Sequence, residues 1–214
     1  CNPAFSTSWA KDIKKYGPYT NIGNDGQQHY GHSHEQAGLY DEQKNPYIKA
    51  FFDWWDAELY KTVHTLRITG GEPLMHTHVW KIMDLLKEQS NSVKYFAVNT
   101  NLIAKDDLID KLIDKSKGIN NFHIYTSNEC VGDKAEYLRD GLDWKTWCKN
   151  LDKIIESKTF AGVSIMCTIN ALSIDGLIEF LDYVIDIKKR NDLSFPTLSL
   201  NILRFPNFQS LDVL

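Results

Sequence analysis

Short apolar runs alternate with longer amphipathic segments along the chain. Runs rich in Val, Ile, Phe, Tyr and Thr predict strands at 64–70, 93–101, 121–127, 162–170 and 197–205. Segments with helical spacing of apolar residues predict helices at 46–62, 78–90, 105–116, 142–158 and 173–190. Thr77 is the expected cap of the second helix, and Ser173 with Asp175 that of the fifth. From the first strand onward, the predicted order is strand and helix in strict alternation.

This order predicts an α/β fold with a parallel sheet and right-handed crossovers. A helix precedes the first visible strand, so we expect a partial (βα)6 TIM-like barrel whose first strand is missing from this chain. The alternative is an open doubly wound sheet. We expect one domain over 1–214, truncated at both ends, with a long loop insertion at 17–45. In either architecture, a ligand site forms at the carboxyl ends of the strands.

Short polar residues follow the predicted strands at that edge. They occur in the segments Thr69-Gly70-Gly71-Glu72-Pro73, Asn99-Thr100-Asn101, Thr126-Ser127-Asn128-Glu129 and Thr168-Ile169-Asn170. The two glycines allow a ligand to approach the main chain without obstruction by a Cβ atom. Exposed carbonyl groups beside Glu72 would suit an ammonium group, and Pro73 biases Glu72 towards an extended backbone.

Composition and charge narrow the function classes. The chain has 43% hydrophobic and 24% charged residues and a formal charge of −4, which is ordinary for a globular protein and gives no basic surface for nucleic acid. No apolar stretch reaches the roughly 18 to 20 residues that cross a bilayer, so we expect no membrane association and a cytoplasmic location.

The cysteines and histidines are the candidate metal ligands of the chain. The cysteines at 1, 130, 148 and 167 lack the close spacing of a disulfide framework or zinc ribbon, and the last three are expected to be structural. A zinc site would have to use the histidines at 29, 32, 34, 76 and 78, whose spacing matches no established signature. We expect the 17–45 insertion to be a lid or a substrate-side loop instead.

The segment Thr69-Gly70-Gly71-Glu72-Pro73-Leu74 resembles the GGEP motif of radical S-adenosylmethionine (radical SAM) enzymes. In that family, the glycine backbone and the glutamate bind the methionine amino group. Cys1 and the residues up to Trp9 resemble the sequence around the third cysteine of the CxxxCxxC motif in a subgroup with a truncated auxiliary-cluster (Twitch) region. The segment 131–144 is similar to a further block of that subgroup.

The resemblance implies a site for each cofactor. S-adenosylmethionine would be bound by Gly70, Gly71, Glu72, Pro73, Thr100, Ser127 and Arg139. Ser127 matches a ribose-contacting serine, whereas Asn128 and Glu129 depart from the commoner continuation. Arg139 matches an arginine that pairs with the methionine carboxylate, which suits its forked guanidinium. Cys1 would be a ligand of a [4Fe-4S] cluster. No catalytic residue is assigned.

The implied activity is reductive cleavage of S-adenosylmethionine and hydrogen abstraction from a peptide or small-molecule substrate. An electron donor such as flavodoxin or ferredoxin would be a partner. These 214 residues alone would be inactive, because the first two cluster cysteines have no position in them. The alternative is a non-catalytic βα-barrel binding domain that keeps the cofactor pocket but lacks the cluster.

Overall fold

The computed structural model describes residues 7–17, 45–192, 194–204 and 209–214. The chain divides into two compact units, Cys1–Tyr60 and Lys61–Leu214. In the described residues of both units, no helix is long and apolar enough to cross a membrane.

The first unit is helical where it is described. Helix α1 (Thr7–Tyr16) was not predicted, whereas α2 (Pro46–Trp54) begins the helix predicted at 46–62. The side chain of Asn45 caps α2 by accepting a hydrogen bond from the Tyr47 amide at 3.0 Å. A single π-helical turn, Trp55–Leu59, then leads into the short helix α3 (Tyr60–Thr62), so the predicted helix is confirmed with an interruption.

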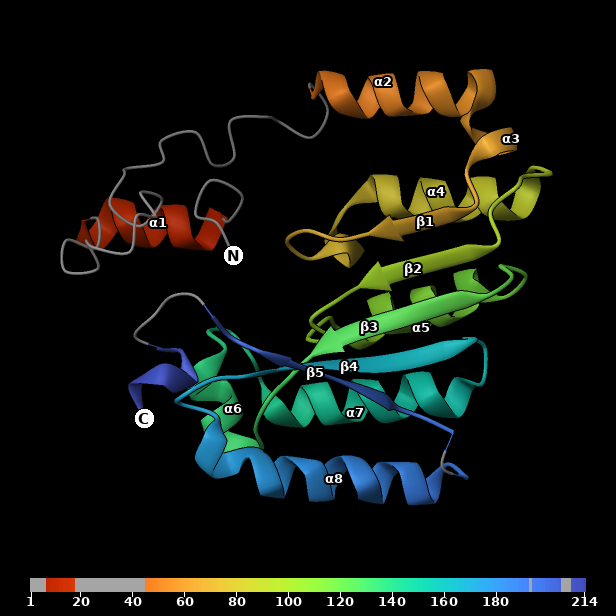
Figure 1. Ribbon diagram of the computed structural model, residues 1–214. Coiled ribbons are helices and arrows are strands. Elements are labelled where there is room, and N and C mark those ends of the chain that lie inside the picture. Colours follow the sequence, from red (N-terminus) through yellow and green to blue (C-terminus); the bar gives the residue numbers. More distant parts are fainter. Residues whose placement is uncertain (1–6, 18–44, 193, 205–208) are drawn as a thin grey trace. The chain divides into compact units, whose positions relative to one another are not determined.

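The second unit contains one sheet of five strands in the order β1-β2-β3-β4-β5 (Figure 1). The strands are β1 (Thr65–Ile68), β2 (Tyr95–Asn99), β3 (Phe122–Ser127), β4 (Gly162–Ile169) and β5 (Thr197–Ile202). Every neighbouring pair is parallel. All five predicted strands are therefore confirmed, with ends that differ by a few residues.

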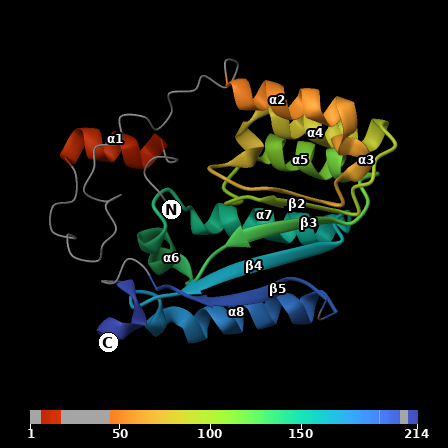
Figure 2. The ribbon, with the colours of Figure 1, turned by 45° about the horizontal axis from the view of Figure 1, so that its top comes forward.

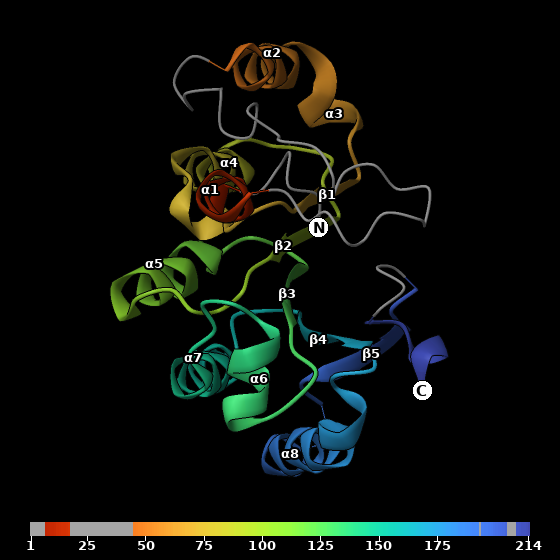
Figure 3. The ribbon, with the colours of Figure 1, turned by 90° about the vertical axis from the view of Figure 1, so that its left-hand side faces the viewer.

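Helices follow the strands in alternation. They are α4 (Thr77–Glu88), α5 (Asp106–Ser116), α6 (Gly132–Leu138), α7 (Trp144–Ser157) and α8 (Leu177–Arg190). The helices α4, α5, α7 and α8 lie on one face of the curved sheet, as the views in Figure 2 and Figure 3 agree. A doubly wound sheet would carry helices on both faces. The fold is the predicted α/β arrangement of a partial TIM-like barrel.

Short helical segments and caps differ from the sequence predictions. Helix α6 was not predicted, and a 3-10 turn, Pro73–Met75, precedes α4. His76 rather than Thr77 is the N-cap residue of α4. Gly176 is the N-cap residue of α8 itself, whereas Ser173 is the N-cap residue of the preceding 3-10 turn, Ile174–Gly176, to which its side chain makes no capping hydrogen bond.

The core lies between the sheet and the helices. Alternate side chains of the central strands are fully buried there, including Phe96, Val98, Ile124 and Ile165. From the helices, Ile109, Leu112, Trp147 and Leu151 pack into the same layer with no exposed area. Burial of such apolar surface is the main favourable contribution to folding.

The opposite face of the sheet, here called the inner face, is mainly polar. Side chains alternate between the two faces of a strand, and neighbouring strands pair in register, so the register identifies which residues share this face. They include Arg67 in β1, Tyr95 and Asn99 in β2, His123, Tyr125 and Ser127 in β3, Ser164, Met166 and Thr168 in β4, and Thr197 and Ser199 in β5. The inner face can therefore meet a polar ligand.

Candidate functional site

Glu72 joins the loops that follow β1 and β2. Its Oε1 accepts a hydrogen bond from Thr100 Oγ1 at 2.8 Å, and its Oε2 accepts one from the Asn101 amide at 2.8 Å. The Leu74 amide also donates to Oε1, at 3.2 Å. Sequence reasoning placed these loops at one edge of the sheet, and the structure brings Glu72 and Thr100 into direct contact there.

The backbone around Glu72 has the conformation expected from the following proline. Its φ and ψ are −119° and 101°, an extended conformation, and Pro73 starts the 3-10 turn that leads to α4. Thr100 is only 4% exposed, and its Oγ1 also accepts a hydrogen bond from the Leu102 amide at 3.1 Å. The carboxylate of Glu72 is therefore held in one orientation by both loops.

The carboxylate of Glu72 keeps some capacity to bind a ligand. An ionised carboxylate can accept about four hydrogen bonds, two at each oxygen. Oε1 already accepts two hydrogen bonds and Oε2 accepts one. One acceptor position on Oε2 is left for an N–H group such as that of an ammonium ion.

Gly70 and Gly71 expose main chain beside this carboxylate. Gly70 has a φ of +128°, a conformation that side-chain-bearing residues rarely adopt. An ideal Cβ atom at either glycine would meet no other atom within 4 Å. There is thus open space on the Cβ side of both glycines, and both residues are exposed. These residues fit the methionine end of S-adenosylmethionine.

Arg139 forms an ion pair with Glu129, which sequence reasoning did not assign to the site. Its Nε donates to Glu129 Oε2 at 2.7 Å, and its Nη2 donates to Oε1. The Glu129 side chain is 5% exposed, and its Oε1 also accepts a long hydrogen bond from the Thr168 amide at 3.4 Å. Arg139 therefore lies near the carboxyl ends of β3 and β4, with one side of its guanidinium bound to the protein's own carboxylate.

The remaining predicted residue, Ser127, is the last residue of β3 and is half-buried on the inner face. Its neighbour Thr126 belongs to the helical side, where it accepts a hydrogen bond from Trp147 Nε1 at 3.0 Å. The alternation leaves Ser127, and not Thr126, available to a ligand.

Two of the described cysteines, Cys130 and Cys167, are poor ligands for iron. Burial raises the pKa of the Cys130 thiol to about 11, with a smaller contribution from Glu129. Burial also raises the pKa of Cys167, to about 12. Both thiols are protonated at neutral pH, whereas a metal is bound by the thiolate. They are buried in the core, as expected for structural cysteines.

The cluster cannot be assembled from the described residues. Within them, no group of three or more His, Cys, Asp or Glu side chains could hold a metal ion. Cys1 and the histidines at 29, 32 and 34 lie outside the described residues. The described residues therefore provide no complete set of ligands for a [4Fe-4S] cluster.

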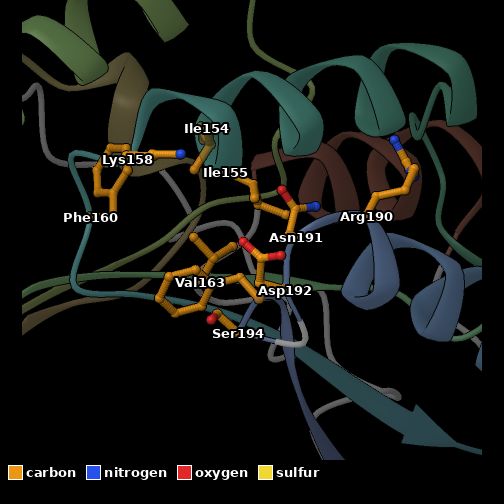
Figure 4. A pocket seen from close by; sticks show the side chains of 10 residues that line it. Ile154, Ile155, Lys158, Phe160, Val163, Arg190, Asn191, Asp192 and Ser194 are labelled. Carbon is orange, nitrogen blue, oxygen red and sulfur yellow. The ribbon is translucent and has the colours of Figure 1, made fainter.

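A cavity of about 340 Å³ lies near the opposite, amino-terminal edge of the sheet (Figure 4). Its walls come from the ends of α7 and α8 and the start of β4, with Lys158, Phe160, Val163 and Arg190 among the lining residues. In βα barrels, ligands bind at the carboxyl ends of the strands. We therefore assign the candidate site to the loops around Glu72 and not to this cavity.

Comparison with known proteins gives similar structures but no sequence relative. No protein-family model and no curated protein matches the sequence. Streptococcus suis SuiB bound to S-adenosylmethionine is similar, with a TM-score of 0.56 and 17% identity over 82% of this chain and 38% of that chain. SuiB bound to the precursor peptide SuiA gives a TM-score of 0.52 and 16% identity over 73% and 31%.

A third structure, of SuiB described without a ligand, has a TM-score of 0.54 and 16% identity over 77% of this chain and 34% of that chain. This chain thus spans about a third of the length of SuiB. The similarity establishes the fold. At such low identity it establishes nothing more specific.

Proposed function

We propose that this chain is the barrel core of a radical SAM enzyme. Such an enzyme uses a [4Fe-4S] cluster to cleave S-adenosylmethionine reductively and to abstract hydrogen from a substrate. The observation that carries the proposal is the exposed Gly70-Gly71 backbone beside Glu72, whose carboxylate is oriented by both neighbouring loops and keeps one acceptor position. The similar fold of SuiB bound to S-adenosylmethionine supports it.

Each residue near the carboxyl edge has a role in this proposal. The carbonyl groups of Gly70 and Gly71 and Oε2 of Glu72 bind the methionine ammonium, while Thr100 fixes the Glu72 carboxylate and Pro73 fixes the turn. Ser127 contacts the ribose. Arg139 binds the methionine carboxylate through the guanidinium N–H groups that Glu129 does not occupy.

Cys1 is proposed as one thiolate ligand of the cluster, which supplies the electron for cleavage of the carbon–sulfur bond. A flavodoxin or ferredoxin would reduce it. The substrate is proposed to be a peptide, because SuiB with the precursor peptide SuiA shares the fold. A small-molecule substrate is the other possibility.

The proposal is tested on the protein made from its complete reading frame and reconstituted with iron and sulfide without oxygen. We expect the visible absorbance of a [4Fe-4S] cluster and release of 5′-deoxyadenosine from S-adenosylmethionine after addition of dithionite. Binding of S-adenosylmethionine without cluster absorbance or cleavage would instead indicate a non-catalytic binding domain. A protein that shows none of the three would contradict both functions.

The variant Gly71→Ala tests the role of the exposed main chain. Its φ is not positive and its Cβ would meet nothing within 4 Å, so the free energy of unfolding should stay within about 0.5 kcal/mol of the wild type. A methyl group in the path of the ligand should weaken binding of S-adenosylmethionine about tenfold, the effect of a modest steric clash. Equilibrium dialysis measures the binding. Unchanged affinity would show that the ligand does not dock on this backbone.

A further inference from the structure

Arg67 is fixed on the inner face by side chains from three other strands. Its Nε donates a hydrogen bond to Asn99 Oδ1 in β2 at 2.9 Å. Its Cζ lies 4.1 Å from the centroid of the Tyr125 ring in β3, a cation–π contact. Its Nη2 lies 3.6 Å from Met166 Sδ in β4. The guanidinium therefore extends from β1 across the inner face and is held in a defined orientation.

The partners of Arg67 are all neutral. They are an amide oxygen, an aromatic ring and a thioether sulfur, which is a weak acceptor. Among the described residues, no carboxylate forms an ion pair with Arg67, although the other ion pairs of this part of the chain are numerous. Its positive charge is thus uncompensated there, and the two N–H groups of Nη1 have no partner in the described structure.

The residues around Arg67 form an ordered surface. The hydroxyl groups of Tyr95 and Tyr125 lie 2.6 Å apart, and the rings of Tyr95 and His123 are stacked with centroids 4.5 Å apart. His123 lies where a side chain at position 162 would be, because a Cβ atom on Gly162 would overlap its ring. The floor beneath Arg67 is therefore packed and needs little reorganisation to bind a ligand.

We propose that Arg67 binds a carboxylate of the substrate on the inner face of the sheet, which makes an acidic residue or a free carboxylate group a requirement of the substrate. A planar guanidinium fixed at Nε offers its terminal N–H groups to a carboxylate in fork geometry. The assignment of this carboxylate to the substrate rests on the proposed function. The carboxylate of S-adenosylmethionine could bind Arg67 through the same contacts, and the test distinguishes it from a carboxylate of the substrate.

The test follows modification of arginines by phenylglyoxal in the full-length protein, with mass spectrometry of the resulting peptides. The probes are the blocked tripeptides acetyl-Ala-Glu-Ala-amide and acetyl-Ala-Gln-Ala-amide, which differ only in the side-chain carboxylate. We expect the glutamate peptide to protect Arg67 at about tenfold lower concentration than the glutamine peptide, as a charge-assisted hydrogen bond would give. Arg190, which is 55% exposed on α8, serves as the unprotected control.

Three results would overturn the proposal. They are equal protection by both peptides, no protection by the glutamate peptide, and protection of Arg67 by S-adenosylmethionine alone, which would assign the carboxylate to the cofactor. Because the reaction needs neither cluster nor reductant, its outcome is independent of the release of 5′-deoxyadenosine. Failure of this inference is therefore distinct from failure of the proposed function.

Two variants separate positioning from general disruption. Asn99→Ala removes the acceptor that orients Nε, so the preference for the glutamate peptide should fall several-fold. Tyr125→Phe keeps the ring under the guanidinium and removes only the hydroxyl group that contacts Tyr95, so the preference should be unchanged. If Tyr125→Phe abolishes the preference and Asn99→Ala retains it, the orientation of Arg67 is not what selects the carboxylate.

Discussion

The contact between Glu72 and Thr100 predicts a measurable coupling between two strand-end loops. Thr100→Val keeps the shape of the side chain but removes the hydroxyl group that donates to Glu72 and accepts from the Leu102 amide. A hydrogen bond to a charged group contributes about 1.5–3 kcal/mol and one between neutral groups about 0.5–1.5 kcal/mol. Since valine recovers part of this by apolar burial, we expect a loss of roughly 2–3 kcal/mol in the free energy of unfolding.

Glu72→Gln is the second change of a double-mutant cycle. Glutamine can still accept a hydrogen bond from the Asn101 amide and can donate one to Thr100, but it loses the charge and an acceptor for the Leu74 amide. We expect this variant to lose about 1–2 kcal/mol alone, and the coupling energy with Thr100→Val to be about 1–2 kcal/mol.

Urea unfolding of the wild type, the two single variants and the double variant gives the coupling energy. Ser116→Ala is the matched control, because Ser116 bonds to Thr159 and Ile113 and has no contact with Glu72. Its coupling with Glu72→Gln should be below about 0.5 kcal/mol. A coupling equally small between Glu72 and Thr100 would refute the view that the carboxylate holds the two loops together.

Three other predictions concern buried groups near the site. Arg139→Met leaves the Glu129 carboxylate buried without its cation. The free energy of unfolding should fall by about 3–5 kcal/mol, which a lower melting temperature would show. A fall below about 1 kcal/mol would mean that water or another donor replaces the guanidinium. Burial raises the pKa of Cys167 from 9.0 to about 12 and that of Cys130 to about 11, while both thiols ionise near the ordinary value after unfolding. The free energy of unfolding should therefore be unaffected by these groups below about pH 9 and fall as the pH rises above it. Maleimide should label both cysteines at pH 7 only after addition of urea, and rapid labelling of the folded protein would contradict their burial.

The strands and most helices could be predicted because their apolar patterns are long and regular. The sequence GDKAEYL of α6 has few apolar residues, and Ala135 alone is buried in it, so no period is visible over its seven residues. The π turn at Trp55–Leu59 lies inside a continuous apolar pattern. An uninterrupted α-helix would show the same pattern. The hydrogen bonding of the π turn depends on the packing of the first unit and could not be inferred from spacing.

The edge that carries the candidate site was predictable, but the contacts within it were not. Parallel strands bring Glu72 and Thr100 to one edge whatever the side-chain orientations. The pairing of Glu129 with Arg139 depends on how α6 turns back towards β3, and no local pattern encodes that geometry. Arg67 could have been identified from the sequence as a candidate site residue, because it is a charged residue between Leu66 and Ile68 in a predicted strand.

The restriction of α4, α5, α7 and α8 to one side of the sheet has a consequence for how this protein can diversify (Figure 3). Residues such as Arg67, Ser164 and Ser199 belong to no apolar layer, so replacing them removes little buried area. Mutations on the inner face can therefore change which ligand is bound without changing whether the chain folds. A library randomised at these positions should retain a high proportion of folded members, and new selectivities could be sought among them at small cost in stability.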